Sequence, residues 1–245
     1  MTTLNAAALL AAWEQGISQP PVRRALVLLA AAYPDKSWKE WAETPIGERD
    51  RRLLGLRQQL FGARIEALAT CPNCAERLEL NFETNDVCTP APLNGSDLQV
   101  ECDGYEVRCR VPTSADLLEV SGADARQGRQ TLLERCVMTA QHGDEIVEPA
   151  LLPEPVVEAM MTEMANADPQ ADVQVALDCP ECKHHWLMDF DILSYLWSEL
   201  SDWAPRLLRE VHLLASNYGW SERDILSMSG FRRRQYLEMI AGGIQ

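Results

Sequence analysis

The sequence predicts an α+β protein in which helical N- and C-terminal parts surround a split zinc ribbon with an inserted β-hairpin and helices. Three observations predict this class. Two Cys-Pro-x-Cys motifs, Cys71–Cys74 and Cys179–Cys182, each precede apolar residues at every second position. The flanking chain carries apolar residues at helical spacings. The 104 residues between the motifs, 75–178, far exceed what a compact ribbon needs.

The two motifs begin the same short pattern, which is a cysteine turn followed by a strand and an acid at identical offsets. The residues are Leu78, Leu80, Phe82 and Glu83 in the first copy, and Trp186, Met188, Phe190 and Asp191 in the second. Zinc needs four ligands at tetrahedral angles, and two thiolates from one tight turn supply half of them. The pattern therefore predicts one structural Zn²⁺ bound by Cys71, Cys74, Cys179 and Cys182.

Other uses of these cysteines fit less well. A disulfide framework is typical of small secreted domains with denser cysteines. A redox pair does not explain a matched second pair, and a catalytic zinc keeps an open position that four thiolates would fill. His184 and His185 follow Cys182 and could replace one ligand, but they are more simply surface residues of the strand. The remaining cysteines are expected to be small apolar residues, namely Cys88, Cys102, Cys109 and Cys136.

Composition allows one large or two small domains, with 245 residues of which 47% are hydrophobic. The first 16 residues lack a basic leader and contain Glu14, and the longest apolar run, Ala25–Tyr33, is too short to span a bilayer. We expect a cytoplasmic protein without membrane insertion. The net charge is −15, distributed as +2 over residues 1–70, −15 over 71–180 and −2 over 181–245. Such an acidic middle disfavours nucleic-acid binding.

Residues 1–68 are expected to form a helical region, with helices at Leu4–Glu14, Pro21–Ala32 and Ile46–Phe61. The third has a broad leucine face, and we expect a solvated basic face opposite. That face would contain Arg49, Arg51, Arg52 and Arg57.

Residues 69–190 are expected to form the ribbon region, mostly helical over about 113–170. Asp103-Gly104 predicts a tight turn between strands Leu98–Cys102 and Tyr105–Val111, in a hairpin that extends the ribbon's sheet. A helix capped by Thr113 or Ser114 should follow. Further helices are expected at Thr131–Gln141 and Pro155–Ala165, and a strand at Val173–Leu177.

Residues 191–245 are expected to be helical again. An apolar stripe runs from Leu200 to Tyr218, and Ser221-Glu-Arg-Asp224 resembles a capping box before a short helix. A last helix begins near Phe231. Trp220 and Arg232, Arg233 and Arg234 are expected to be exposed at a turn and a helix start, where they would bind a protein partner.

No glycine-rich phosphate loop, nucleophile elbow or His-Glu-x-x-His motif is present in the sequence, so a non-enzymatic role is expected. Two other classes stay open. One is a zinc-ribbon regulator that binds nucleic acid through basic helices. The other is a metal-dependent hydrolase in which one cysteine is displaced from zinc.

Across most of its length the chain resembles a known family. The motifs that carry the resemblance are Ile46-Gly-Glu-Arg-Asp with Leu53-Leu54, Phe61-Gly62, both cysteine pairs, Arg110-Val-Pro-Thr-Ser-Ala-Asp-Leu117, Glu210-Val-His-Leu-Leu-Ala, Tyr218-Gly-Trp-Ser-Glu and Arg232-Arg-Arg-Gln-Tyr-Leu237. The sequence is similar to zinc-containing baseplate-associated proteins of contractile-tailed phages and phage-derived contractile injection systems, which are related to hub-assembly chaperones. The resemblance implies a cytoplasmic, non-enzymatic protein of baseplate or tail assembly, whose partners are baseplate or hub proteins. Chaperone and structural component both stay open, as does the oligomeric state.

Overall fold

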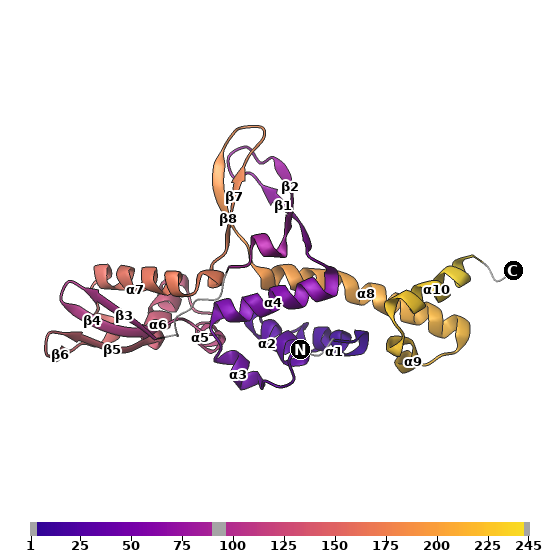
Figure 1. The fold of residues 1–245 in the computed structure, drawn as a ribbon, viewed down its shortest axis with the longest axis horizontal. Coiled ribbons are helices and arrows are strands. Elements are labelled where there is room, and N and C mark those ends of the chain that lie inside the picture. Colours follow the sequence, from indigo (N-terminus) through magenta and orange to yellow (C-terminus); the bar gives the residue numbers. More distant parts are fainter. Residues whose placement is uncertain (1–3, 90–96, 243–245) are drawn as a thin grey trace. The chain divides into compact units, whose positions relative to one another are not determined.

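The computed structural model describes residues 4–89 and 97–242 and confirms the α+β class (Figure 1). The chain separates into two compact units. Unit 1 contains residues 1–38 and 193–245, and unit 2 contains residues 39–192. The three-part division at residues 68 and 190 stays a prediction.

The regular elements in the described part of unit 1 are all helices. Its helices are α1 (Ala6–Gly16), α2 (Pro21–Ala32), α8 (Ile192–Tyr218), α9 (Glu222–Ser227) and α10 (Gly230–Ala241). The Asn5 side chain caps α1 by accepting a hydrogen bond from the Ala8 N–H at 2.8 Å. Pro21 begins α2, where its missing N–H costs nothing. α8 continues through Pro205.

The apolar stripe predicted for α8 is present and contributes to a core of unit 1. Leu207, Val211 and Leu214 are buried with Leu10 of α1 and Ile225 of α9. The short helix α9 begins where the capping pattern predicts, because Ser221 Oγ accepts a hydrogen bond from the Asp224 N–H at 3.2 Å. The stripe therefore holds three helices together across nearly the whole sequence.

Unit 2 contains the short helix α3 (Trp38–Ala42), the long helix α4 (Ile46–Phe61) and three separate sheets. The first sheet is β1 (Arg64–Thr70) with β2 (Arg77–Glu83), and the third is β7 (Gln174–Asp178) with β8 (His185–Asp189). The second has the order β3 (Asp97–Cys102), β4 (Tyr105–Arg110), β5 (Val137–His142) and β6 (Glu145–Ile146). Within its described residues, unit 2 is completed by three α-helices and three short 3₁₀ helices. The α-helices are α5 (Ser114–Glu119), α6 (Ala125–Cys136) and α7 (Glu154–Ala167), and the 3₁₀ helices are η1 (Thr84–Asp86), η2 (Pro149–Leu151) and η3 (Pro169–Ala171).

Helix α4 has the predicted bounds, but the prediction of a basic face is wrong for two of its arginines. Arg49 and Arg57 are 5% and 2% exposed. The Arg49 Nε pairs with Asp50 Oδ1 at 2.7 Å. Arg57 Nη1 donates to the Gly62 carbonyl at 2.7 Å, which satisfies the last turn of the helix. Helical periodicity alone placed these charges in solvent, and their local partners allow them to be buried.

Two predictions about the sheets are corrected. Strand β1 occupies the end of the region predicted to be helical, because Ile65 and Ala69 are buried at alternating positions against β2. The inserted hairpin β3–β4 does not extend the ribbon's sheet but belongs to its own four-stranded sheet. Its predicted turn is confirmed, since Asp103 and Gly104 have φ angles of 50° and 80°.

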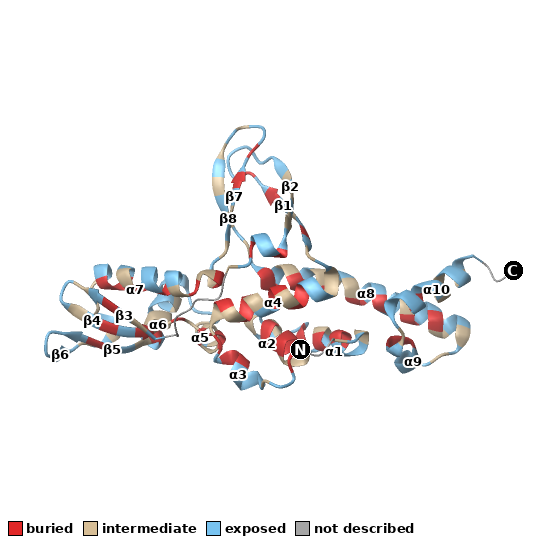
Figure 2. Ribbon diagram, viewed as in Figure 1, coloured by how far each residue is buried: buried red, intermediate tan, exposed pale blue. Residues whose placement is uncertain are grey.

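The four-stranded sheet has its own core, formed with α7 on one face (Figure 2). Val100 and Val107 of the sheet are buried with Val156 and Met160 of α7. The prediction of a helix over Thr131–Gln141 is wrong beyond Cys136. Residues Val137–His142 form β5 instead, because they pair with β4 and bury Ala140 in this core.

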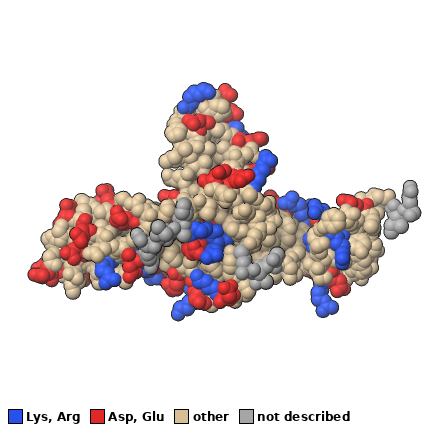
Figure 3. Space-filling model, in the orientation of Figure 1, with Lys and Arg blue, Asp and Glu red and all other residues tan. Residues whose placement is uncertain are grey.

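The two units differ in net charge. Unit 2 carries 13 Lys/Arg and 29 Asp/Glu, for a net charge of −16, whereas unit 1 carries 9 and 8, for a net charge of +1. Acidic side chains spread over the β3–β6 sheet and α7 in Figure 3. No helix in the described part of the chain is long and apolar enough to cross a membrane.

Candidate metal centre

Each cysteine pair lies in a turn between two strands of one hairpin. In the first turn, the Cys71 N–H donates to the Glu76 carbonyl at 2.8 Å, and the Ala75 N–H donates to the Cys71 carbonyl at 2.9 Å. Ala75 adopts a φ of 62°, which is uncommon for a residue with a side chain. These bonds direct both thiols of the turn to the same side.

The second turn has the same geometry, with each residue 108 positions after its counterpart in the first turn. The Cys179 N–H donates to the His184 carbonyl at 2.9 Å, and the Lys183 N–H donates to the Cys179 carbonyl at 3.0 Å. Lys183 has a φ of 58°. Two turns with different residues at the left-handed position adopt one conformation, so the cysteine spacing and its backbone bonds define the turn.

The strands on either side place the two turns against each other. Thr70 pairs with Arg77 in the first hairpin and Asp178 with His185 in the second, which is the same register. At the far ends of the hairpins, Phe82 contacts Phe190 edge to face, with ring centroids 5.5 Å apart. The repeated sequence thus produces two matched hairpins with facing apolar sides.

Four sulfurs converge between the turns. Cys71 Sγ lies 3.7 Å from Cys182 Sγ, and Cys74 Sγ lies 3.5 Å from Cys179 Sγ. All four ligand atoms lie within 4.8 Å of one another. Zn–S bonds of about 2.3 Å at tetrahedral angles separate two sulfurs by about 3.8 Å. The four cysteines therefore have a spacing that fits a metal ion coordinated by four sulfurs.

The thiols perturb one another. A hydrogen bond from the Asn73 side chain, and another from the His184 backbone, lower the pKa of Cys182 to about 6. A backbone hydrogen bond at Glu76 favours the Cys74 thiolate, but the neighbouring thiols and desolvation outweigh it and raise the pKa of Cys74 to about 12. Four thiolates this close repel one another unless a cation lies between them, and a divalent metal would supply that charge.

The two histidines near the second turn make other contacts. His185 Nδ1 lies 2.9 Å from Asp178 Oδ1 on the neighbouring strand, and both side chains are largely exposed. The His184 ring is stacked with that of Trp186 at a centroid distance of 6.0 Å. Neither imidazole belongs to the cluster of converging ligand atoms found among the described residues.

The other cysteines lie elsewhere. Cys109 and Cys136 are buried in the core of the four-stranded sheet, where desolvation raises the pKa of each thiol to about 11. Cys102 is partly buried and Cys88 is exposed. The two core thiols are neutral apolar residues, as the sequence suggests.

The residues predicted to bind a partner do not share one environment. Arg232 and Arg234 are exposed. Arg233 is only 6% exposed, so the expected exposure is wrong for this residue. Its guanidinium contacts Glu210 Oε2 at 3.2 Å and donates to the Met228 carbonyl at 2.8 Å. Trp220 is half-buried and stacks on Tyr218 at 4.5 Å.

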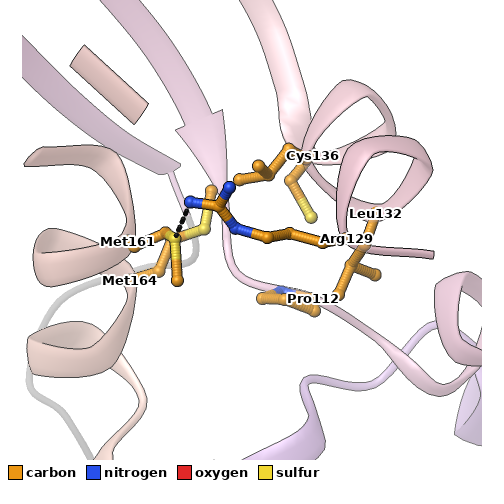
Figure 4. A pocket seen from close by; sticks show the side chains of 7 residues that line it. Pro112, Arg129, Leu132, Cys136, Met161 and Met164 are labelled. Atoms are coloured by element: carbon orange, nitrogen blue, oxygen red, sulfur yellow. Dashed lines mark hydrogen bonds between the residues drawn. The ribbon is translucent and has the colours of Figure 1, made fainter. Parts of the chain in front are cut away.

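An apolar pocket of about 190 Å³ lies between α6 and α7, and sequence reasoning did not find it (Figure 4). Arg129 lies at the pocket and pairs with Glu154 at 2.9 Å, beside the Met161 sulfur at 3.3 Å. The only sequence signal was the apolar spacing within each helix. The lining residues are Pro112, Arg129, Leu132, Leu133, Cys136, Met161 and Met164. Since the pocket holds no carboxylate or imidazole, it offers no acid–base pair.

A comparison with known proteins covers most of the chain. A family model described as T4 bacteriophage base plate protein matches residues 8–196. No curated protein and no solved structure matches. The matched segment contains α4, both cysteine turns and all three sheets. Because the match covers well over half of the sequence, the chain belongs to the T4 bacteriophage base plate protein family.

Proposed function

We propose that this chain is a non-enzymatic zinc-ribbon protein that acts in baseplate assembly, either as an assembly chaperone or as a permanent structural component. The observation that carries the proposal is the family match over residues 8–196, which includes both cysteine pairs. Its partners would be other baseplate or hub proteins, and it would act in the cytoplasm or within the assembled particle.

The convergence of Cys71, Cys74, Cys179 and Cys182 supports a single structural Zn²⁺. A soft, all-sulfur tetrahedron suits zinc better than magnesium or calcium, which prefer oxygen ligands. The metal would join two cysteine pairs separated by 104 residues of chain. Zinc would hold the two halves of the ribbon together at the base of a large insertion.

The same cluster supports a non-enzymatic role. Four thiolates leave no position for a water or substrate on the metal. We expect purified protein to show no metal-dependent hydrolysis of phosphate or peptide model substrates. Hydrolysis that disappears when His184 or His185 is replaced by alanine would contradict this role.

The metal assignment is tested with Cys179→Ser and, as a matched control, Cys88→Ser at an exposed cysteine outside the cluster. Structural zinc contributes roughly 10–16 kcal/mol of apparent binding free energy in small zinc-finger peptides, coupled to folding. We expect the Cys179 variant to lose its zinc and become partly unfolded or insoluble, while the control keeps one zinc per chain. Elemental analysis and thermal melting measure this. Full zinc content and an unchanged Tm in Cys179→Ser would reject the site.

The assembly role is tested in cells that express the accompanying tail genes with or without this chain. Without it we expect tubes or spikes that lack complete baseplates in electron micrographs. Mass spectrometry of finished particles then separates the two roles, since a component remains and a chaperone is found only in intermediates. Normal baseplates without the chain would contradict the proposal.

A further inference from the structure

Helix α10 exposes an apolar face that its packing does not require. Tyr236, Leu237 and Ile240 pack against the unit 1 core. Phe231 and Met239 point away from this side and are 68% and 54% exposed. At 100° per residue, Phe231, Gln235 and Met239 follow one another along the opposite side of the helix. We call Phe231, Arg232, Arg234, Gln235 and Met239 the outer face of α10.

The charges of this face are also unbalanced. The first turn of α10 contains no acidic residue. Arg232 and Arg234 lie close to the positive end of the helix dipole, where cations are unfavourable. Within residues 4–89 and 97–242 neither forms an ion pair, whereas the intervening Arg233 is paired with Glu210. Glu238 lies beside the outer face and accepts a hydrogen bond from Gln235 at 2.9 Å, so its single carboxylate does not balance the two arginines.

The helix is held firmly from its other side. Arg233 is bonded to Glu210 and to the Met228 carbonyl, and Ser229 Oγ caps the helix through the Arg232 N–H at 3.2 Å. Tyr236 contacts Tyr218 and Trp220 at centroid distances of 5.6 and 4.8 Å. A rigid support reduces the entropy lost when exposed side chains are bound.

We propose that the outer face of α10 docks onto an acidic protein segment of another baseplate component that has an apolar recess for Phe231. Arg232 and Arg234 would pair with carboxylates beside this recess, which would relieve the unfavourable charge at the helix start. Aromatic and arginine side chains are enriched at binding hot spots. The proposal rests on the proposed function and specifies its partner chemistry, with Phe231 as the anchor in place of the half-buried Trp220.

A photo-crosslinker placed at Gln235, in the middle of the face, tests this in cells that express the tail genes. The same crosslinker at the exposed His212 of α8 is the control. We expect Gln235, but not His212, to capture one tail protein at an acidic segment. Arg232→Glu with Arg234→Glu should reduce the yield at least tenfold, as should Phe231→Asp, while Arg206→Glu on α8 should not. Melting curves confirm that each variant is folded.

Capture of nucleic acid, of a second copy of this chain, or of a segment without carboxylates would overturn the proposal, as would no capture. Counting complete baseplates in electron micrographs distinguishes a failure of the docking proposal from a failure of the proposed function. If baseplates require the chain but form normally with Phe231→Asp and with the double arginine variant, the docking proposal fails alone. If baseplates form without the chain, the proposed function has failed.

Discussion

Gly47 lies in the first turn of α4, where no neighbouring side chain caps the helix. The side chain of Asp168, which is distant in sequence, provides the cap instead. The Gly47 N–H donates to Asp168 Oδ2 at 2.8 Å, while Pro45 at the N-cap provides no side-chain bond. Burial raises the pKa of Asp168, despite this bond. The approach of Asp168 needs a residue without a side chain.

Gly47→Ala should therefore destabilise the protein. An added Cβ would overlap Asp168 Oδ1 and come within 3.0 Å of the Ala171 backbone nitrogen. We expect a loss of about 1–3 kcal/mol in the free energy of unfolding, measured in urea. Gly55→Ala on the same helix is the control. It has open space around it and should stabilise by up to about 1 kcal/mol. Equal effects of both changes would contradict this explanation.

Asp116 is a buried carboxylate of unit 2 with several hydrogen-bond partners. It is fully buried and pairs with Arg110 Nη1 at 2.6 Å and Arg135 Nε at 2.9 Å, and it accepts the Thr113 N–H at 2.9 Å. Burial disfavours its charge, but these bonds outweigh burial and hold its pKa well below the usual range. It joins the start of α5 to the end of α6.

Asp116→Asn should cost about 1.5–3 kcal/mol at neutral pH, because two partly exposed arginines lose their charged hydrogen-bond partner. A lowered folded pKa means that this stability is present above the unfolded aspartate pKa of about 3.9 and is lost as pH falls below it. The gap between wild type and variant should therefore narrow below about pH 5. Urea unfolding from about pH 2 to about pH 7 measures it, because the loss falls mainly below the unfolded pKa. A gap that is constant with pH would show that the charge of Asp116 is not responsible.

At the scale of elements, the ribbon and the four-stranded sheet differ in how they are held. The ribbon consists of two two-stranded sheets, and such hairpins are marginal by themselves. The β3–β6 sheet packs on α7 through buried valines and methionines. The ribbon should depend on its metal far more than the inserted sheet does.

Chelation followed by hydrogen exchange tests this dependence. After zinc removal, we expect amide exchange to rise strongly in β1, β2, β7 and β8, while β3, β4 and β5 stay protected. Mass spectrometry of peptides from both regions provides the measurement, and the inserted sheet serves as the internal control. A uniform rise across both regions would indicate that the insertion also needs the metal, while no rise would contradict a structural zinc.

Over the whole molecule, charge should influence stability unevenly. Unit 2 has a net charge of −16 and unit 1 of +1. The carboxylates of unit 2 repel one another, and at 0.1 M salt this repulsion is largely screened between exposed charges more than about 10 Å apart.

Raising NaCl from roughly 0.02 to 0.3 M should increase the Tm of the unit 2 transition by a few degrees, because screening weakens self-repulsion. The unit 1 transition should move less. Scanning calorimetry follows both. The control is the same titration at about pH 5.5, nearer the sequence pI of about 4.7, where the salt effect should shrink. A fall in Tm with salt at neutral pH would mean that attractive ion pairs dominate.

The sequence alone determined features that depend on residues a few positions apart. The cysteine turns, the Asp103-Gly104 hairpin turn, the Ser221 cap and the α8 stripe all follow from contacts within one or two turns of chain, and the structure contains each of them. The resemblance to baseplate proteins came from motifs of the same local kind. The family match over residues 8–196 confirms that the chain is a baseplate-family protein.

Only the tertiary structure decided features whose partners lie far along the chain. Residues Val137–His142 directly follow helix α6, yet they form strand β5 because their backbone pairs with the neighbouring strand β4. Arg233 is buried because Glu210 on another helix neutralises it. Asp168 caps α4 from 121 positions away. Such long-range bonds offset local preferences, and a pattern read over a few residues contains no information about them.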